Sequence, residues 1–187
     1  TIALAEVMGE AGVARFVFSS SATVYGQPDA LPVAEDAPLK PQSVYGRTKR
    51  TAEDFLRDLT RANANWRIAI LRYFNLAGAH PSARIGESPA DRPQNLVPLL
   101  CKIAGGEIGE LAIFGSDWPT EDGTGVRDYL HVQDLADGHV AAIRYLGSTA
   151  GATTLNLGMG RGWSVLEVVR AFERACVRLL PRRHARR

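Results

Sequence analysis

The sequence has few cysteines, no long apolar run and almost no net charge, and each of these absences excludes a class of protein. Its two cysteines, Cys101 and Cys176, lie far apart without His or Cys neighbours at ligand spacing, so we predict no disulfide framework. None of the four histidines pairs with another at metal spacing, so no metal site is assigned. The net charge of +2 is too close to neutral to predict a nucleic-acid partner. No apolar run approaches the length of a membrane span, so no membrane partner is expected.

The two ends of the chain also lack features of a complete or secreted protein. No basic residues precede an apolar stretch at the start, so we predict no secretory leader and expect a cytoplasmic protein with buried or unreactive cysteines. The first residue is Thr1, and residues 2–13 predict a helix with no cap before it, which indicates a fragment. Residues 178–187 hold five arginines, and we interpret them as a solvated or truncated end rather than as an anion site.

The sequence does contain enough apolar material for a core, since 45% of its 187 residues are hydrophobic. Glu167, three residues after Ser164, predicts a capping box at the start of a helix. Because predicted strands alternate with predicted helices, we expect an α/β fold with parallel strands. The predicted strands are 15–21, 66–74, 111–115, 126–132 and 153–158, and the predicted helices are 46–63, 95–104, 134–146 and one from Ser164.

The first chemical signal is the segment Tyr45-Gly-Arg-Thr-Lys49. Positions four apart share a helix face, so Lys49 can bring its ammonium near the Tyr45 ring or near a cofactor beside it. A free tyrosine has a pKa of about 10, and a nearby positive charge lowers the pKa toward that of a useful base. The motif is short enough to arise by chance, so an ordinary exposed helix turn is the alternative interpretation.

The second signal is the run of hydroxyl residues from Ser19 to Thr23, which follows a predicted strand. Proteins with α/β folds bind ligands at the carboxyl ends of their strands. Ser21 lies 24 residues before Tyr45, a gap that fits a loop and a helix start, so the two side chains can converge. A Ser/Thr turn that caps the strand end explains the same residues, and both interpretations stay open at this point.

Five segments in chain order carry a more specific resemblance. They are FVFSSSATVYG, PQSVYGRTK, LRYFNLAGAHP, LAIFGSDWPTEDGTGVRDYLHVQDLADGHV and NLGMGRGWSVLEVV. Together they resemble the UDP-hexose 4-epimerases of the extended short-chain dehydrogenase/reductase family. The resemblance implies a partial Rossmann-like, doubly wound parallel sheet plus a smaller α/β substrate-binding region. It assigns 1–75 to the C-terminal portion of the NAD-binding domain and 76–187 mostly to the UDP-sugar-binding region, with 126–150 returning to the Rossmann-like part.

The resemblance also implies roles for individual residues. Tyr45 is the expected catalytic base, Lys49 is expected to hold the ribose of NAD and tune Tyr45, and Ser21 is expected to pass a proton from the sugar hydroxyl. The implied NAD-binding residues are Ser21, Tyr45, Lys49, Tyr73 and Phe74. The implied UDP-sugar-binding residues are Ser21, Tyr45, Asn75, Asn95, Leu96, Ala112, Ile113, Phe114 and Arg127.

The implied reaction is NAD-dependent epimerisation at C4 of a UDP-hexose, which interconverts UDP-glucose and UDP-galactose. The resemblance also implies that the full-length protein is a homodimer. The chemistry of Arg127 agrees with its implied role in holding UDP, since a guanidinium matches phosphate oxygens. A surface ion pair is the alternative interpretation of Arg127. Two other functions stay open: a related NAD-dependent sugar-nucleotide dehydratase or reductase, and a truncated remnant without catalysis. A dehydratase needs additional acids, and Ser21 is followed by Ala22 and Thr23 instead, which argues against it.

One part of the family pattern has no counterpart in this sequence. The family begins with a strand, a Gly-rich turn and a helix whose N-terminus binds the NAD pyrophosphate, and nothing before Arg15 can supply them. The glycines between Gly158 and Gly162 have the wrong spacing for that turn, so we predict an ordinary tight turn there. We therefore expect the chain to be inactive by itself.

Overall fold

The computed structural model of the chain describes residues 1–87 and 93–186 and divides into two compact units. Unit 1 comprises Thr1–Phe74 and Asp134–Gly158, and unit 2 comprises Asn75–Gln133 and Met159–Arg187. The segment that returns to the first unit is therefore 134–158, whereas the resemblance implies 126–150. The two differ because the strand at 126–131 pairs with strands of unit 2.

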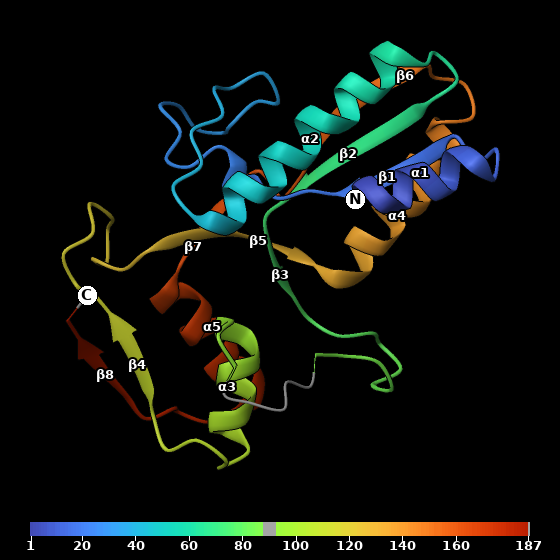
Figure 1. Ribbon diagram of the computed structural model, residues 1–187. Helices are drawn as coiled ribbons and strands as arrows, with labels where there is room; N and C mark the ends of the chain where they lie inside the picture. Colours follow the sequence, from blue (N-terminus) through green and yellow to red (C-terminus); the bar gives the residue numbers. More distant parts are fainter. Residues whose placement is uncertain (88–92, 187) are drawn as a thin grey trace. The chain divides into compact units, whose positions relative to one another are not determined.

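Unit 1 is built on a parallel sheet whose strands follow the order β1-β2-β6 (Figure 1). The strands are β1 (Arg15–Ser19), β2 (Arg67–Tyr73) and β6 (Gly151–Leu157). They are accompanied by the helices α1 (Ile2–Glu10), α2 (Val44–Ala62) and α4 (Val132–Tyr145), and by a short 3-10 turn, η1 (Ala22–Val24). Both strand pairs run parallel, which confirms the α/β architecture predicted from the sequence.

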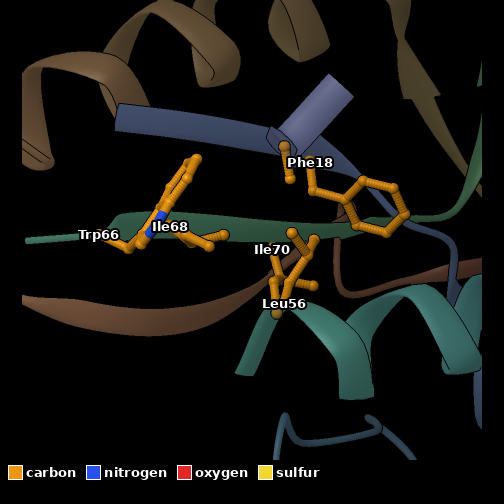
Figure 2. Packing of buried hydrophobic residues seen from close by; sticks show 6 residues of the cluster. Phe18, Leu56, Trp66, Ile68 and Ile70 are labelled. Carbon is orange, nitrogen blue, oxygen red and sulfur yellow. The ribbon is translucent and has the colours of Figure 1, made fainter. Parts of the chain in front are cut away.

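The core of unit 1 follows from the alternation of side chains along β2. Ile68 and Ile70 lie on one face of the sheet, where they pack with Leu56 of α2 (Figure 2). Leu71 lies on the other face and packs with Ala142 of α4. Helices therefore cover both faces of this sheet, and β2 lies between them.

The described residues of unit 2 form two small sheets and two helices. One sheet has the order β3-β5-β7, with β3 (Asn75–Ala77), β5 (Val126–His131) and β7 (Gly162–Ser164), and the other pairs β4 (Leu111–Phe114) with β8 (Arg182–Ala185). The helices α3 (Leu96–Ala104) and α5 (Val165–Cys176) pack with β4 around Leu100, Leu111 and Val169. Ser164 and Glu167 form the predicted capping box at the start of α5, so that prediction is confirmed.

The arginine-rich end is solvated, as predicted, because Arg178, Arg182, Arg183 and Arg186 are exposed, but it also forms a strand that the sequence did not predict. The residues of β8 pair in parallel with β4, and Arg182 lies opposite Leu111. Leu180, just before β8, is 4% exposed and packs in the core of unit 2. The guanidinium of Arg182 donates to the carboxylate of Glu173 at 2.6 Å. One buried leucine thus anchors a strand whose charged side chains reach outward, as long arginine side chains readily do.

Two further features differ from the predictions. The strands β3 and β7 are three residues each, too short for a periodic pattern to reveal them. Cys101 and Cys176 are exposed, so of the two alternatives, buried or unreactive thiols, the first is wrong and the second stays a prediction; on α3, Leu100 and Ile103 face the core instead. Of the helices in residues 1–87 and 93–186, none combines the length and the apolar composition that crossing a bilayer requires.

Leu56→Ala tests how firmly α2 packs on the sheet. Leu56 is fully buried, so truncating it leaves a cavity and should lower the free energy of unfolding by about 3 kcal/mol. Urea denaturation followed by circular dichroism measures this change. Leu4→Ala on the half-exposed face of α1 is the matched control and should cost less than about 1 kcal/mol. Equal costs for the two variants would contradict the packing described for Leu56.

Candidate active site

The end of β1 presents three consecutive hydroxyl residues in different directions. β1 ends at Ser19, and Ser21 then caps the turn η1. The Oγ of Ser21 accepts hydrogen bonds from the backbone N–H of Thr23 at 3.2 Å and from the Thr23 hydroxyl at 2.9 Å. Because these bonds use its lone pairs, the Ser21 hydroxyl keeps its own proton for another acceptor. The turn predicted as the alternative for Ser21 is therefore present, and it orients the hydroxyl.

The first turn of α2 brings Tyr45 to this strand end. The Oγ of Ser43 accepts the N–H of Gly46 at 3.0 Å and so begins the helix. A Cβ at Gly46 would lie 2.8 Å from the carbonyl oxygen of Thr23, so a glycine is needed for α2 to approach η1 this closely. Tyr45, beside Gly46, is 50% exposed, and its hydroxyl lies next to the Ser21 side chain.

Lys49 lies one turn further along the same face of α2. Its Nζ donates to the carbonyl oxygen of Ser19 at 2.8 Å. The same Nζ lies 5.6 Å from the centre of the Tyr45 ring and 5.2 Å from the centre of the Phe18 ring. The predicted approach of Lys49 to Tyr45 is confirmed, and the spacing of four residues on a helix is its cause.

The acidity of Tyr45 differs from the expectation. Burial raises the pKa of its phenol above the ordinary value of 10.0, the neighbouring Tyr73 raises it further, and the hydrogen bond from Ser21 lowers it in part. The net effect is therefore a raised pKa in the chain as it stands, and the lowering of this pKa by Lys49 stays a prediction. The ammonium of Lys49 binds a backbone carbonyl of β1 instead of the phenol oxygen.

Tyr73 and Phe74 lie at the end of β2, beside β6. The N–H of Phe74 donates to the last carbonyl of β6 at 3.2 Å, and the ring centre of Tyr73 lies 6.4 Å from that of His139 on α4. The Nδ1 of His139 donates to the Leu135 carbonyl at 2.9 Å, so in the neutral ring Nε2 accepts the Ser19 hydroxyl at 2.9 Å. Sequence reasoning missed this contact of Ser19 with His139, because 120 positions separate the two residues.

Apart from Ser21 and Tyr45, the residues predicted to hold a UDP-sugar lie in unit 2. They are Asn75 on β3, Asn95 before α3, Leu96 on α3, Ala112, Ile113 and Phe114 on β4, and Arg127 on β5. Phe114 is 65% exposed, whereas the side chain of Ile113 is buried in the core and its backbone pairs with His184 of β8. The exposed guanidinium of Arg127 donates to the carbonyl of Val126 at 2.8 Å.

A buried charged network next to the end of β1 was missed by sequence reasoning. Glu53 on α2 and Arg72 on β2 are 0% and 1% exposed and form a two-pronged ion pair, with Nε–Oε1 at 3.0 Å and Nη2–Oε2 at 2.6 Å. Ser20 donates to Oε1 of Glu53 at 2.5 Å, and Arg72 donates to the hydroxyl of Tyr25 at 2.8 Å. Two signals could have revealed the network: an arginine inside an apolar predicted strand, and an acid four residues after Lys49 on the same helix face.

The glycine-rich turn at 158–162 binds a carboxylate of the chain itself. The N–H groups of Met159 and Gly160 each donate to Asp128 at 2.9 Å. Gly160 has a φ of 70°, a conformation that favours glycine. The backbone groups with which a cofactor phosphate would bond thus serve an internal acid, which supports the prediction of an ordinary tight turn.

The fold and the site together define a parallel α/β protein in which a serine, a tyrosine and a lysine converge at the carboxyl end of a strand. Residues 1–158 match the NAD dependent epimerase/dehydratase family, and the chain belongs to that family. The resemblance inferred from the five sequence segments is thereby confirmed.

Curated relatives include enzymes from bacteria and plants. UDP-glucose 4-epimerase of Bacillus subtilis (strain 168) is 52% identical over 187 residues, which cover 100% of this chain and 55% of the relative. The bifunctional UDP-glucose 4-epimerase and UDP-xylose 4-epimerase 1 of Pisum sativum is 50% identical over 190 residues, which cover 98% of this chain and 54% of the relative. The chain therefore spans about half the length of the curated relatives it matches.

Solved structures of related proteins share the fold. UDP-glucose-4-epimerase from Stenotrophomonas maltophila, with bound NAD and formylated UDP-arabinopyranose, has a TM-score of 0.96 and 50% identity, covering 100% of this chain and 55% of that one. UDP-glucose 4-epimerase from Bifidobacterium longum, in complex with NAD+ and UDP, has a TM-score of 0.94 and 46% identity, covering 100% and 56%. The likeness confirms the α/β fold class.

Tyr45 is expected to ionise above pH 10.0, because burial and Tyr73 both favour its neutral phenol. At neutral pH the chain therefore carries a protonated Tyr45. Ultraviolet difference titration of the chain against Tyr45→Phe isolates this ionisation, and Tyr145→Phe on α4 is the matched control. If the unchanged chain has an absorbance component that titrates below pH 10.0 and Tyr45→Phe lacks it, the raised pKa of Tyr45 is contradicted.

Glu53 is expected to make unit 1 less stable in acid. Burial opposes its charge, but hydrogen bonds from Arg72 and Ser20 and the charges of Arg72 and Arg57 outweigh burial, so the pKa of Glu53 is lowered. A carboxyl with a lowered folded pKa contributes stability that is present above its unfolded pKa and is lost as the pH falls through the folded value. The urea midpoint should therefore fall on acidification below pH 4.5, and it should fall less in Glu53→Gln/Arg72→Met. An identical fall in both chains would show that other carboxyls are responsible.

Proposed function

We propose that the chain is the part of a UDP-glucose 4-epimerase that carries its proton-transfer residues and much of its UDP-sugar site. The observation that carries the proposal is the convergence of Ser21, Tyr45 and Lys49 at the end of β1. The proposal is supported by identities of about half, along the whole chain, to proteins named as UDP-glucose 4-epimerases. A homodimer stays a prediction from the resemblance, and a cytoplasmic location stays a prediction from the sequence.

In this proposal Tyr45 removes the proton of the C4 hydroxyl of the sugar. Because the pKa of its phenol is raised, Tyr45 must first ionise to act as a base, and the Ser21 hydroxyl can donate to the phenolate oxygen and stabilise it. Lys49, one helical turn away, adds a positive charge that favours the phenolate. NAD, when bound, accepts the C4 hydride and returns it.

The described residues fit the nicotinamide end of NAD better than its pyrophosphate. Tyr45 is half exposed, Lys49 is a cation with donors to spare for ribose hydroxyls, and Tyr73 and Phe74 supply rings at the neighbouring strand end. The turn at 158–162 does not fit a phosphate, because its N–H groups bind an internal carboxylate. We therefore infer that turnover requires the additional length that the relatives have.

Unit 2 is proposed to hold the UDP portion. Arg127 presents an exposed guanidinium, which suits bidentate contact with phosphate oxygens, and Phe114 offers an exposed ring. The implied contacts of Asn75, Asn95, Leu96, Ala112 and Ile113 belong to the same proposal. Firm binding of the remote UDP would hold the reacting sugar while leaving it free to turn over between proton and hydride transfers.

A chimera tests this function. The chain replaces the matching 55% of the Bacillus subtilis relative, and the conversion of UDP-galactose is followed by product analysis. We expect UDP-glucose as the product. Tyr45→Phe should lower kcat by a factor of about 100 or more, because the base is lost. Tyr145→Phe on α4 is the matched control and should leave kcat unchanged.

The identity of the product separates the competing functions. Accumulation of a keto sugar would contradict the epimerase proposal and favour a dehydratase. A folded chimera that binds UDP without converting the sugar would contradict catalysis and favour a non-catalytic remnant. Full turnover in Tyr45→Phe would remove Tyr45 from the role of base.

A further inference from the structure

Consecutive residues at the end of β1 are each linked to the same face of α2. We call this arrangement the β1–α2 clasp, and its three links are the hydrogen bonds of Ser19 with Lys49 and of Ser20 with Glu53, and the approach of Ser21 to Tyr45. The helix residues are spaced by four, so they form one stripe along α2. Helix and strand end are therefore joined at three successive points.

The middle link of the clasp differs from the other two. Ser20 and Glu53 are both 0% exposed, whereas Tyr45 is half exposed and Lys49 reaches only a backbone carbonyl. The Ser20 hydroxyl donates to an ionised carboxylate at 2.5 Å, and a charge-assisted bond of this kind is among the strongest that a hydroxyl makes. The backbone N–H of Ser20 also donates to Leu71 at 2.8 Å, so Ser20 is held at both main chain and side chain.

The carboxylate of Glu53 is itself fixed in place. Its two oxygens accept from Arg72 at 3.0 and 2.6 Å, and Arg57 donates to Oε2 at 3.1 Å. Arg72 is anchored in turn by bonds to the Tyr25 hydroxyl at 2.8 Å and to the Glu35 carbonyl at 2.9 Å. Any displacement of Glu53 would leave buried charges without partners, so the carboxylate is a rigid reference point for Ser20.

We propose that Glu53 is a positioning residue of the Ser–Tyr–Lys site: by holding Ser20, it fixes the direction in which the next residue, Ser21, presents its hydroxyl to Tyr45. Glu53 acts through Ser20 and has no direct contact with the proposed reacting atoms. The chemical meaning of this role rests on the proposed function. The geometric claim does not, and it can be tested in the chain without catalysis.

The test is a double-variant cycle read out as the pKa of Tyr45. Carbon NMR of chains labelled at the tyrosine Cζ gives this pKa, with Tyr45→Phe as the assignment. Ser21→Ala removes the bond that lowers the pKa of Tyr45, so the pKa should rise. In a Ser20→Ala background the same substitution should raise the pKa by less than half as much, because Ser21 is no longer held in place.

Two controls separate positioning from general loosening of the fold. Ser20→Thr keeps the hydroxyl and should restore the full effect of Ser21→Ala. Thr124→Val also removes a buried hydroxyl that donates to a carboxylate, that of Asp122 at 2.7 Å, but it lies in unit 2 and should leave the effect unchanged. If Ser20→Ala does not fold, Glu53→Asp replaces it in the cycle, since it keeps the charge for Arg72 but withdraws the carboxylate from Ser20.

Equal rises in pKa on Ser21→Ala in both backgrounds would overturn the proposal and leave Glu53 with a purely structural role. The same is true if Thr124→Val reduces the Ser21 effect as much as Ser20→Ala does. These outcomes say nothing about epimerisation, and a chimera without turnover would leave the result of the cycle standing. Failure of the positioning role and failure of the proposed function are thus distinguishable.

Discussion

The buried ion pair of Glu53 and Arg72 is the interaction on which the arrangement of unit 1 depends. Burying two charges costs several kcal/mol unless both are paired and hydrogen-bonded. Here the helix α2 supplies the carboxylate and the central strand β2 supplies the guanidinium. Neutral groups of Ser20, Tyr25 and Glu35 make further hydrogen bonds with the two charged side chains. In the part of the chain that the structure describes, no buried side-chain nitrogen or oxygen lacks a partner. The pair therefore permits few other placements of α2 on the sheet.

The same network holds the long loop that separates η1 from α2. The side chain of Asn156 on β6 accepts from the Tyr25 hydroxyl at 2.7 Å and donates to the Val33 carbonyl at 2.9 Å. Its backbone N–H donates to the Glu35 carboxylate at 2.9 Å. The two ends of the loop approach each other at Gly26 and Lys40. A glycine is needed there, because a Cβ at position 26 would collide with the carbonyl of Lys40. A segment with little regular structure is thus fastened to the middle and the edge of the sheet.

Those parts of the fold that depend on neighbours in sequence were predictable. The capping box at Ser164 and the approach of Lys49 to Tyr45 both follow from spacings of three or four residues, which fix geometry locally. Alternation of strands and helices was enough for the parallel sheet. The five family segments in their order added the class of chemistry, which no single spacing specified.

The parts that depend on distant residues were not predictable. The arginines of β8 obscure any strand pattern in its sequence. Its pairing with β4 depends on Leu180, which packs in a core formed by distant residues. The contact of Ser19 with His139 joins the end of β1 to α4, two segments that are far apart in the chain. The acidity of Tyr45 depends on how deeply its ring is buried, which is a property of the assembled unit and not of the motif.

The turn at 158–162 shows how a glycine motif can resemble a ligand site without being available as one. Asp128 is tethered to the turn by the same chain, so its effective concentration there far exceeds that of any free anion. A dissolved phosphate would have to displace a competitor that never diffuses away. Selection for a well-formed turn and selection for a phosphate cradle can therefore leave nearly the same glycines in a sequence, and only the occupant of the N–H groups tells them apart.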